Sequence, residues 1–292
     1  FVAQVWEILK LLQANFHMPV DLEFAHDGTD FYLLQCRPQS YSQTSFPAIL
    51  PHDVANDRIL FTANRYVPNG TVTGVTHIVY VDPQKYADIS NRSDLIAVGK
   101  AVSRLNQVLP KRQFILMGPG RWGSRGDIKL GVSVTYSDIN NTAMLVEIAR
   151  KRKDYVPELS FGTHFFQDLV EASIRYLPLY PDDESTFFNE SFLMKAENLL
   201  SQLAPEHGHL DDVVRVIDVR TSASGLVLQI LMNGELDQAF ALFTEPQTGT
   251  TEKQQFQREA ETAEQRMDTY WRWRLSVVEY IAESLDSSRF GV

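Results

Sequence analysis

The spacing of apolar residues changes several times along the chain, and each change indicates a different kind of secondary structure. Residues 1–15 carry apolar side chains three or four positions apart, which is typical of an amphipathic helix. Residues 20–25 and 31–37 instead have the character of two short strands. Pro19 disfavours helical backbone at the residue before it, so the helix should end there. The pattern therefore predicts a helix followed by a two-stranded hairpin.

The central part of the chain alternates strand-like and helix-like stretches from Ile59 onward. Strands are expected at residues 76–81, 113–117, 130–136, 143–148 and 175–179, and helices at residues 94–108 and 164–174. Three more strands have the spacing of a meander, with Asn233-Gly234 as a hairpin turn, at residues 213–219, 226–232 and 238–243. This alternation is typical of an α/β fold, of the mixed α+β kind, with a mixed sheet.

Two stretches without periodicity divide the chain. Residues 38–51 are rich in Ser, Gln and Pro, which indicates a linker with a domain boundary near Gln43. The Gln- and Thr-rich residues 244–251 precede residues 252–285, where apolar positions recur every three or four residues as in a long amphipathic helix. We therefore expect three parts: a helix and hairpin in residues 1–42, an α/β domain in residues 43–250, and a C-terminal helix in residues 251–292.

Composition then limits the class of protein. Apolar residues make up 44% of the 292 residues and charged residues 22%, and no apolar run approaches the roughly 18 residues of a membrane span. The formal charge of −10 disfavours nucleic acid as a partner. Cys36 is the one cysteine, which fits a reducing cytoplasm better than secretion. The chain starts at Phe1 within a helical pattern and without a charged signal-peptide start, so we expect it to begin inside a longer protein.

The hairpin carries the densest set of polar candidates. Its apolar residues at even positions, Leu22, Phe24, Tyr32, Leu34 and Cys36, can share one face only if paired positions sum to an even number. A loop of three or five residues with a sum of 58 places Glu23 opposite Gln35. The same register places Asp21 opposite Arg37. Such a face suits Mg²⁺ and phosphate oxygens, or it is a solvated face with a cross-strand ion pair.

The same strands carry strings that resemble a known family. The string DLEFA at residues 21–25, the Asp-Gly turn at residues 27–28 and the string LQCRP at residues 34–38 resemble the last strands of a particular nucleotide-binding domain. It is the ATP-grasp domain of phosphoenolpyruvate synthase and pyruvate phosphate dikinase. The resemblance is dense and covers about residues 5–40.

This resemblance implies that Glu23 and Gln35 are ligands of Mg²⁺ and ATP and that Arg37 contacts a phosphate, with Asp21 structural. It implies an ATP-dependent phosphotransferase of the kinase type that acts on a small phosphoryl acceptor. An upstream ATP-grasp subdomain of the same protein would supply the Gly-rich phosphate loop. The string TGVTH at residues 73–77 lacks the paired glycines and the Ser of the family's phosphohistidine motif.

The rest of the chain is similar to the C-terminal region of large bacterial proteins described only as pyruvate/phosphoenolpyruvate-binding-domain proteins. That likeness implies no activity for the region. The alternative to a phosphotransferase is therefore a non-catalytic ligand-binding or docking module that retains the ATP-grasp hairpin.

A second candidate site is the string GPGRWGSRG at residues 118–126. Its glycines let backbone N–H groups approach an anion closely, and Arg121 can complete the cradle. Gly118 and Gly120 are therefore candidates for cofactor binding, and Arg121 for a catalytic role. The alternative is a strained turn that holds Trp122 in a core.

A third candidate is the string SFGTHFFQD at residues 160–168. Gly162 or Thr163 would cap a helix whose first turn contains His164, and the N–H groups of that turn favour anions. His164 could donate to a ligand or act as a general base, or it could pack against a neighbouring backbone group. We predict that Arg121 and His164 converge on one pocket, because both lie where a strand or loop enters a helix.

Two further motifs favour a structural explanation. The string HGHLDD at residues 207–212 partly matches the H-x-H-x-D-H of metallo-hydrolases, but its last position is Asp and residues 199–203 before it favour a helix. An exposed loop explains it better. The string WRWR at residues 271–274 could stack on bases, but it lies in an acidic amphipathic helix, so packing between domains or subunits is favoured.

Overall fold

The structure is a computed structural model that describes residues 1–16, 20–38, 46–123, 128–151, 157–161 and 163–246. The expected helix at residues 252–285, with its WRWR string, lies outside the described residues. Within the described ranges the fold is a mixed α/β structure with several sheets, as predicted.

The N-terminal unit consists of a helix and a hairpin, as the sequence predicts. Helix α1 spans Val2–Phe16, and strands β1 (Val20–His26) and β2 (Phe31–Pro38) pair antiparallel. The register places Glu23 opposite Gln35 and Asp21 opposite Arg37, so the predicted sum of 58 is confirmed for this half of the hairpin.

The other half of the hairpin differs from the prediction. A β-bulge follows the Glu23 pair, so Phe24 pairs with Leu33 and its ring stacks on Phe31 with 5.0 Å between centroids. Tyr32 was expected on the same face as Phe24, but it pairs with Ala25, the next residue of β1, whose side chain points to the opposite face. The expected single apolar face is therefore wrong near the turn, because one extra residue in β2 reverses the side-chain alternation.

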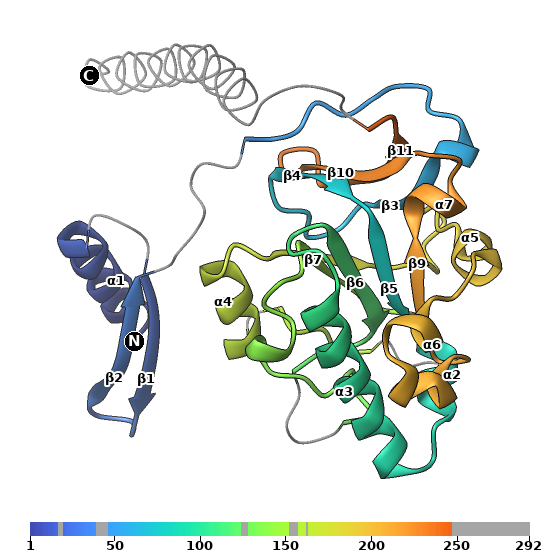
Figure 1. Cartoon of the computed structure of the whole chain (residues 1–292). Helices are drawn as coiled ribbons and strands as arrows, with labels where there is room; N and C mark the ends of the chain where they lie inside the picture. The colour runs from blue at the N-terminus through green and yellow to red at the C-terminus, as the bar shows by residue number, and fades with distance from the viewer. Residues whose placement is uncertain (17–19, 39–45, 124–127, 152–156, 162, 247–292) are drawn as a thin grey trace.

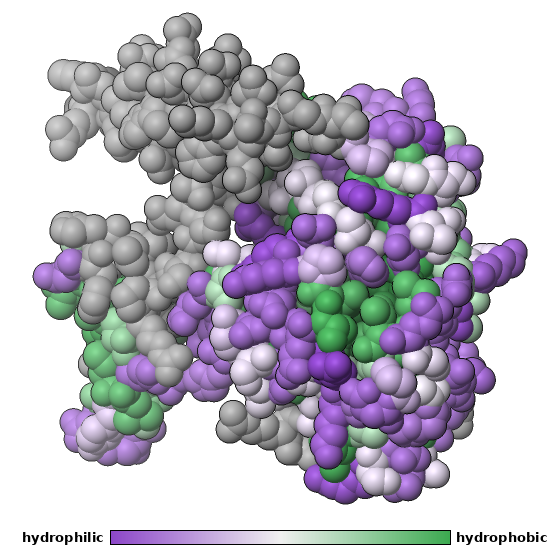
Figure 2. Space-filling model, in the orientation of Figure 1, coloured by the Kyte–Doolittle hydropathy of each residue, from purple (hydrophilic) through white to green (hydrophobic). Residues whose placement is uncertain are grey.

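Large apolar side chains cover much of the surface of this unit. Figure 2 shows hydrophobic residues over the hairpin strands, and the exposed set comprises Phe1, Val2, Trp6, Leu11, Phe24, Tyr32, Leu33 and Leu34. Eight such residues in a helix and a hairpin exceed the scattered apolar exposure of an ordinary surface. The unit therefore presents surface suited to contact with another part of a protein.

The body of the chain is built on a five-stranded sheet in the order β8-β7-β6-β5-β9 (Figure 1). Four of its strands run parallel, β5 (His77–Val81), β6 (Phe114–Pro119), β7 (Met144–Ile148) and β8 (Arg175–Leu179). Strand β9 (Val214–Asp218) pairs antiparallel with β5. The parallel strands are almost wholly buried, which explains their continuous apolar sequences. Their positions confirm the predicted strands to within two residues.

A second, antiparallel sheet covers one face of the first. Its order is β3-β11-β10-β4, with β3 (Ile59–Ala63), β4 (Gly70–Val75), β10 (Val227–Asn233) and β11 (Gln238–Thr244). The predicted hairpin of β10 and β11 is confirmed. The prediction that residues 213–219 belong to the same meander is wrong, because this strand, β9, lies in the five-stranded sheet. Strands β3 and β4 were not predicted from the sequence.

Helices cover the opposite face of the five-stranded sheet (Figure 1). Helices α3 (Arg92–Val108), α4 (His164–Glu171) and α6 (Leu200–Leu203) pack there against Leu116 and Leu145. Ile115 and Met117, the alternate residues of β6, pack toward the second sheet instead. This alternation gives three layers with a core on each side of the central sheet.

The remaining short elements are α2 (Pro83–Asp88), α5 (Glu190–Lys195), α7 (Val219–Ser222), and the 3₁₀ helices η1 (Asn56–Arg58), η2 (Tyr136–Asp138) and η3 (Pro205–Leu210). The HGH part of the HGHLDD string falls within η3, and α6 confirms the helix expected before it. The expected strand at residues 130–136 is wrong, because only Gly131 forms a β-bridge, with Gly120.

Candidate functional site

Glu23 and Gln35 face each other on adjacent strands, at the last regular pair before the bulge. The Glu23 side chain is about half exposed, and its Oε1 lies 3.5 Å from Nε2 of His164 in the first turn of α4. The structure thus brings together two of the predicted site residues that the sequence placed in separate motifs. A carboxylate beside an imidazole forms an ion pair only when the imidazole is protonated.

The Asp-Gly turn explains why the hairpin closes where it does. Asp27 Oδ1 accepts hydrogen bonds from the backbone N–H groups of Thr29 and Asp30, and its Oδ2 accepts one from the Tyr32 hydroxyl. The bond from Asp30, followed by those from Thr29 and Tyr32, lowers the pKa of Asp27. Gly28 has a φ of 103°, a region that side chains disfavour. The turn residues of the family-like string therefore have a local structural role.

The glycines after β6 allow two close approaches within the body. A Cβ on Gly118 would lie 2.7 Å from the ring of Trp122. Gly120 has a φ of 54°, and a Cβ there would lie 1.9 Å from the carbonyl oxygen of Leu130. The N–H of Gly120 already donates to the Ile148 carbonyl. The close packing explains why both positions need a residue without a side chain. A role for Gly118 and Gly120 in binding an anion stays a prediction.

We call residues 118–120, which carry the two glycines, the glycine turn. The backbone after this turn pairs with residues 130–132, which belong to the segment that was expected to be a strand. Arg121 N–H donates to the Leu130 carbonyl, and Gly123 N–H donates to the Val132 carbonyl. These bonds hold the segment against the turn, where no full strand ladder develops among the described residues. Trp122 lies between these two residues and is buried, with 1% of its surface exposed.

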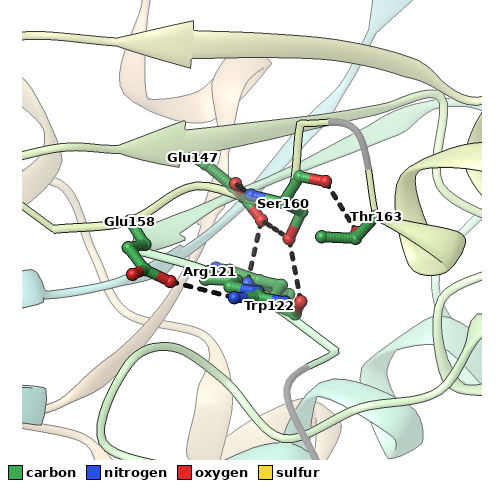
Figure 3. Close-up of polar contacts among 6 residues, drawn as sticks. All are labelled: Arg121, Trp122, Glu147, Glu158, Ser160 and Thr163. Carbon is green, nitrogen blue, oxygen red and sulfur yellow. Dashed lines mark hydrogen bonds and ion pairs between the residues drawn. The ribbon is translucent and has the colours of Figure 1, made fainter. Parts of the chain in front are cut away.

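Arg121 and His164 have different acidic partners. Arg121 Nη1 lies 2.9 Å from Oε2 of Glu158, and both side chains are partly exposed (Figure 3). His164 is exposed and contacts Glu23. Thr163 caps α4 as expected, because its hydroxyl accepts a hydrogen bond from Phe166 N–H. The convergence of Arg121 and His164 on one pocket stays a prediction.

A buried carboxyl group lies at the centre of the region that contains the glycine turn and the α4 cap (Figure 3). Glu147, on β7, is completely buried. Its Oε1 lies 2.8 Å from Trp122 N and 2.5 Å from Ser160 Oγ. Its Oε2 lies 2.6 Å from Ser160 N and 2.8 Å from the Tyr176 hydroxyl. One side chain therefore joins the glycine turn, the segment before α4 and strand β8.

Burial raises the pKa of Glu147 to about 7, although the hydrogen bonds from Ser160, Trp122 and Tyr176 act in the opposite direction. The pKa of Tyr176 is also raised, first by its own burial and then by Glu147, so this hydroxyl remains a donor. Sequence reasoning missed the group. The available signal was one acidic residue within the apolar strand MLVEI at residues 144–148.

Comparison with known proteins gives one finding. Residues 2–57 match the family model described as the pyruvate phosphate dikinase AMP/ATP-binding domain. The match contains Glu23, Gln35 and Arg37 and covers less than half of the chain. Neither the curated proteins nor the solved structures gave a match. The N-terminal part of the chain is thus similar to a nucleotide-binding domain of that family.

The described part of the chain lacks two further features. No cluster there contains three or more His, Cys, Asp or Glu side chains placed to hold a metal ion. Every helix within the same residues is too short or too polar to cross a membrane.

Proposed function

We propose that residues 1–42 form the C-terminal end of an ATP-grasp nucleotide-binding domain in an ATP-dependent phosphotransferase. The enzyme would be of the kinase type and resemble phosphoenolpyruvate synthase and pyruvate phosphate dikinase. The observation that carries the proposal is the hairpin register, which pairs Glu23 with Gln35 and Asp21 with Arg37 inside the matched segment. These two cross-strand pairs, separated by one further pair, are made of acidic, amide and basic residue types.

These groups suit Mg²⁺ and a polyphosphate. A carboxylate and an amide provide the oxygen ligands that Mg²⁺ prefers, and the cation keeps several waters and bridges phosphates. Glu23 and Gln35 would hold Mg²⁺ against the phosphates of ATP, and Arg37 would bind phosphate oxygens through its planar fork. Mg²⁺, when bound, neutralises charge on the transferred group. The hairpin supplies two of the ligands, so the others come from ATP, water and the rest of the domain.

The exposed apolar surface of the N-terminal unit supports the proposal that this unit packs against a partner. We propose that the partner is an upstream ATP-grasp subdomain of the same protein, against which α1 and the hairpin pack. We also propose that the enzyme transfers the phosphoryl group to a small-molecule acceptor and that it is located in the cytoplasm. Cys36, which forms no disulfide, is compatible with a reducing compartment.

The test is the isosteric substitution Glu23→Gln in the full-length protein. Loss of the charge should abolish ATP turnover, because Mg²⁺ loses an anionic ligand. The thermal unfolding temperature should stay unchanged, because Glu23 is exposed on a hairpin face. The matched control is Glu7→Gln, which removes an exposed carboxylate from α1 in the same matched segment. ATP hydrolysis or exchange at the normal rate in Glu23→Gln would contradict the assignment.

The 292-residue chain by itself should bind ATP weakly, because the proposal assigns most of the nucleotide contacts to the upstream subdomain. Calorimetric titration with Mg²⁺-ATP measures this directly. Tight binding, with a dissociation constant below about 1 μM, would show that the chain contains a complete nucleotide site.

A further inference from the structure

A cavity of about 380 Å³ lies at the edge of the five-stranded sheet where three parallel strands end. Its wall includes Pro83 after β5, Gly120 after β6 and Arg150 after β7. Ligands of open α/β sheets bind outside the carboxyl ends of the strands. The volume lies at the lower end of the range for small-molecule sites, which favours a small ligand over a macromolecule. The position and the volume of the cavity therefore both fit a ligand-binding site of an α/β fold.

The charge of this cavity is opposite to that of the chain. Its lining contains three basic residues, Lys129, Arg150 and Lys151, and one acid, Asp88. The chain as a whole has a formal charge of −10, so most of its surface repels anions. Three basic side chains gather at this carboxyl edge, one of them paired with Glu190, and this local excess of basic groups favours an anion.

The body holds in place the side chain of Arg150 and the backbone of Lys151, which follow β7. Arg150 Nη2 lies 3.1 Å from Oε2 of Glu190, and its guanidinium lies over the ring of Phe188. The backbone N–H of Lys151 donates to Asp182 Oδ2 over 2.6 Å. Arg150 Nε is buried without a hydrogen-bond partner in the described part of the chain. The Arg150 guanidinium is thus positioned before any ligand arrives, which lowers the entropic cost of binding.

We propose that this cavity binds the phosphate group of a small phosphate monoester, with Lys129, Arg150 and Lys151 around the phosphate. A phosphate monoester carries a charge of about −1.5 to −2 at pH 7, so basic side chains around it make charge-assisted contacts. Arg and Lys are the side chains that bind phosphate most readily. The cavity lies in the α/β body, so this inference does not depend on nucleotide binding at the hairpin.

The test is calorimetric titration of the 292-residue chain with glycerol 2-phosphate at constant ionic strength. Glycerol and sodium sulfate serve as parallel titrants that separate recognition of the monoester from recognition of its alcohol or of any dianion. We expect saturable binding of glycerol 2-phosphate, with glycerol inactive and sulfate weaker. Lys151→Gln and Lys129→Gln should each weaken binding by about fivefold or more, because each removes one cation from the cavity wall.

The matched control is Lys100→Gln, which removes the same charge from the exposed surface of α3. It should leave the dissociation constant unchanged. The proposal is wrong if the chain shows no saturable binding of glycerol 2-phosphate, or if both cavity variants bind like the original chain. Equal weakening in all three variants would also overturn it, because net charge and not the cavity would then govern binding.

Discussion

The carboxyl group of Glu147 and the hydroxyl of Ser160 lie 2.5 Å apart in the body, and the same hydroxyl lies 2.8 Å from the Trp122 carbonyl. Ser160 has one hydroxyl proton and therefore cannot donate to both oxygens. If Glu147 is protonated, it donates to Ser160 Oγ, and the proton of Ser160 then goes to the carbonyl. The arrangement is thus complete with a neutral Glu147, in agreement with a pKa raised by burial to about 7.

Glu147 should make the stability of the body depend on pH. Between its ordinary value of 4.5 and about 7, the folded chain keeps a proton that the unfolded chain has lost. The free energy of unfolding should therefore fall as pH rises through this window, by on the order of 3 kcal/mol in total. Urea unfolding at a series of pH values measures the slope.

The Glu147→Gln variant isolates this contribution. It should be less stable at low pH, by about 1–3 kcal/mol, because an amide cannot accept every hydrogen bond that the carboxyl accepts. Its stability should lack the fall between pH 4.5 and about 7. Glu171→Gln, at an exposed position of α4, should keep the original slope. Parallel curves for the original chain and Glu147→Gln would exclude the assignment.

Gly120→Ala should destabilise the chain by about 3 kcal/mol or more, because the new Cβ meets the backbone of Leu130 and the left-handed φ adds strain. Gly74→Ala is the matched control, since Gly74 has a φ of 67° with no atom within 4 Å of the added Cβ. It should lose only about 1 kcal/mol. Urea unfolding compares the two variants, and similar losses would show that φ alone requires the glycine at residue 120.

Two adjacent residues should differ sharply on truncation. Trp122→Ala removes a buried indole and should lower the free energy of unfolding by about 3–5 kcal/mol. Arg121→Ala breaks a partly exposed ion pair with Glu158 and should change it by less than about 1 kcal/mol. Chemical denaturation of both variants checks the difference. A large loss in Arg121→Ala would mean that this guanidinium supports more of the fold than its pair with Glu158.

Arg112 should stabilise the turn that precedes β6. Its guanidinium donates to the carbonyls of Thr142 and Ala172 at 2.8 and 2.7 Å, which ties the turn before β6 to the ends of two other segments. Arg112→Ala should cost about 2–3 kcal/mol, because these carbonyls lose a charged donor. The neighbouring variant Lys111→Ala, at an exposed position, should have a small effect in the same denaturation experiment. Equal effects would contradict this role.

Elements with local signals were predictable from the sequence. The turn at residues 27–28 and the alternation in β1 and β2 define the register that pairs Glu23 with Gln35. Thr163 marks the start of α4, because its hydroxyl accepts a hydrogen bond from Phe166 N–H. In each of these cases the residues that decide the structure lie within a few positions of one another.

Features that depend on distant partners were not predictable in this way. The alternation of residues 213–219 identifies a strand but not its neighbour, and β9 joins β5 rather than β10. The hydrogen bonds of Glu147 reach residues from 13 to 29 positions away, so only the folded chain reveals them. The bulge in β2 also left no signal, because Leu33 and Leu34 are equally apolar.

The pairing of β3 with β11 determines the order in which the chain can assemble during synthesis. Strand β3 ends at residue 63 and its partner in the sheet ends at residue 244, so nearly all of the body is made between them. The apolar β3 must therefore remain without this partner while the rest of the body is translated, and such distant pairing slows folding. The helix and hairpin of the N-terminal unit contact mainly each other, so they can form while the following body is still being translated.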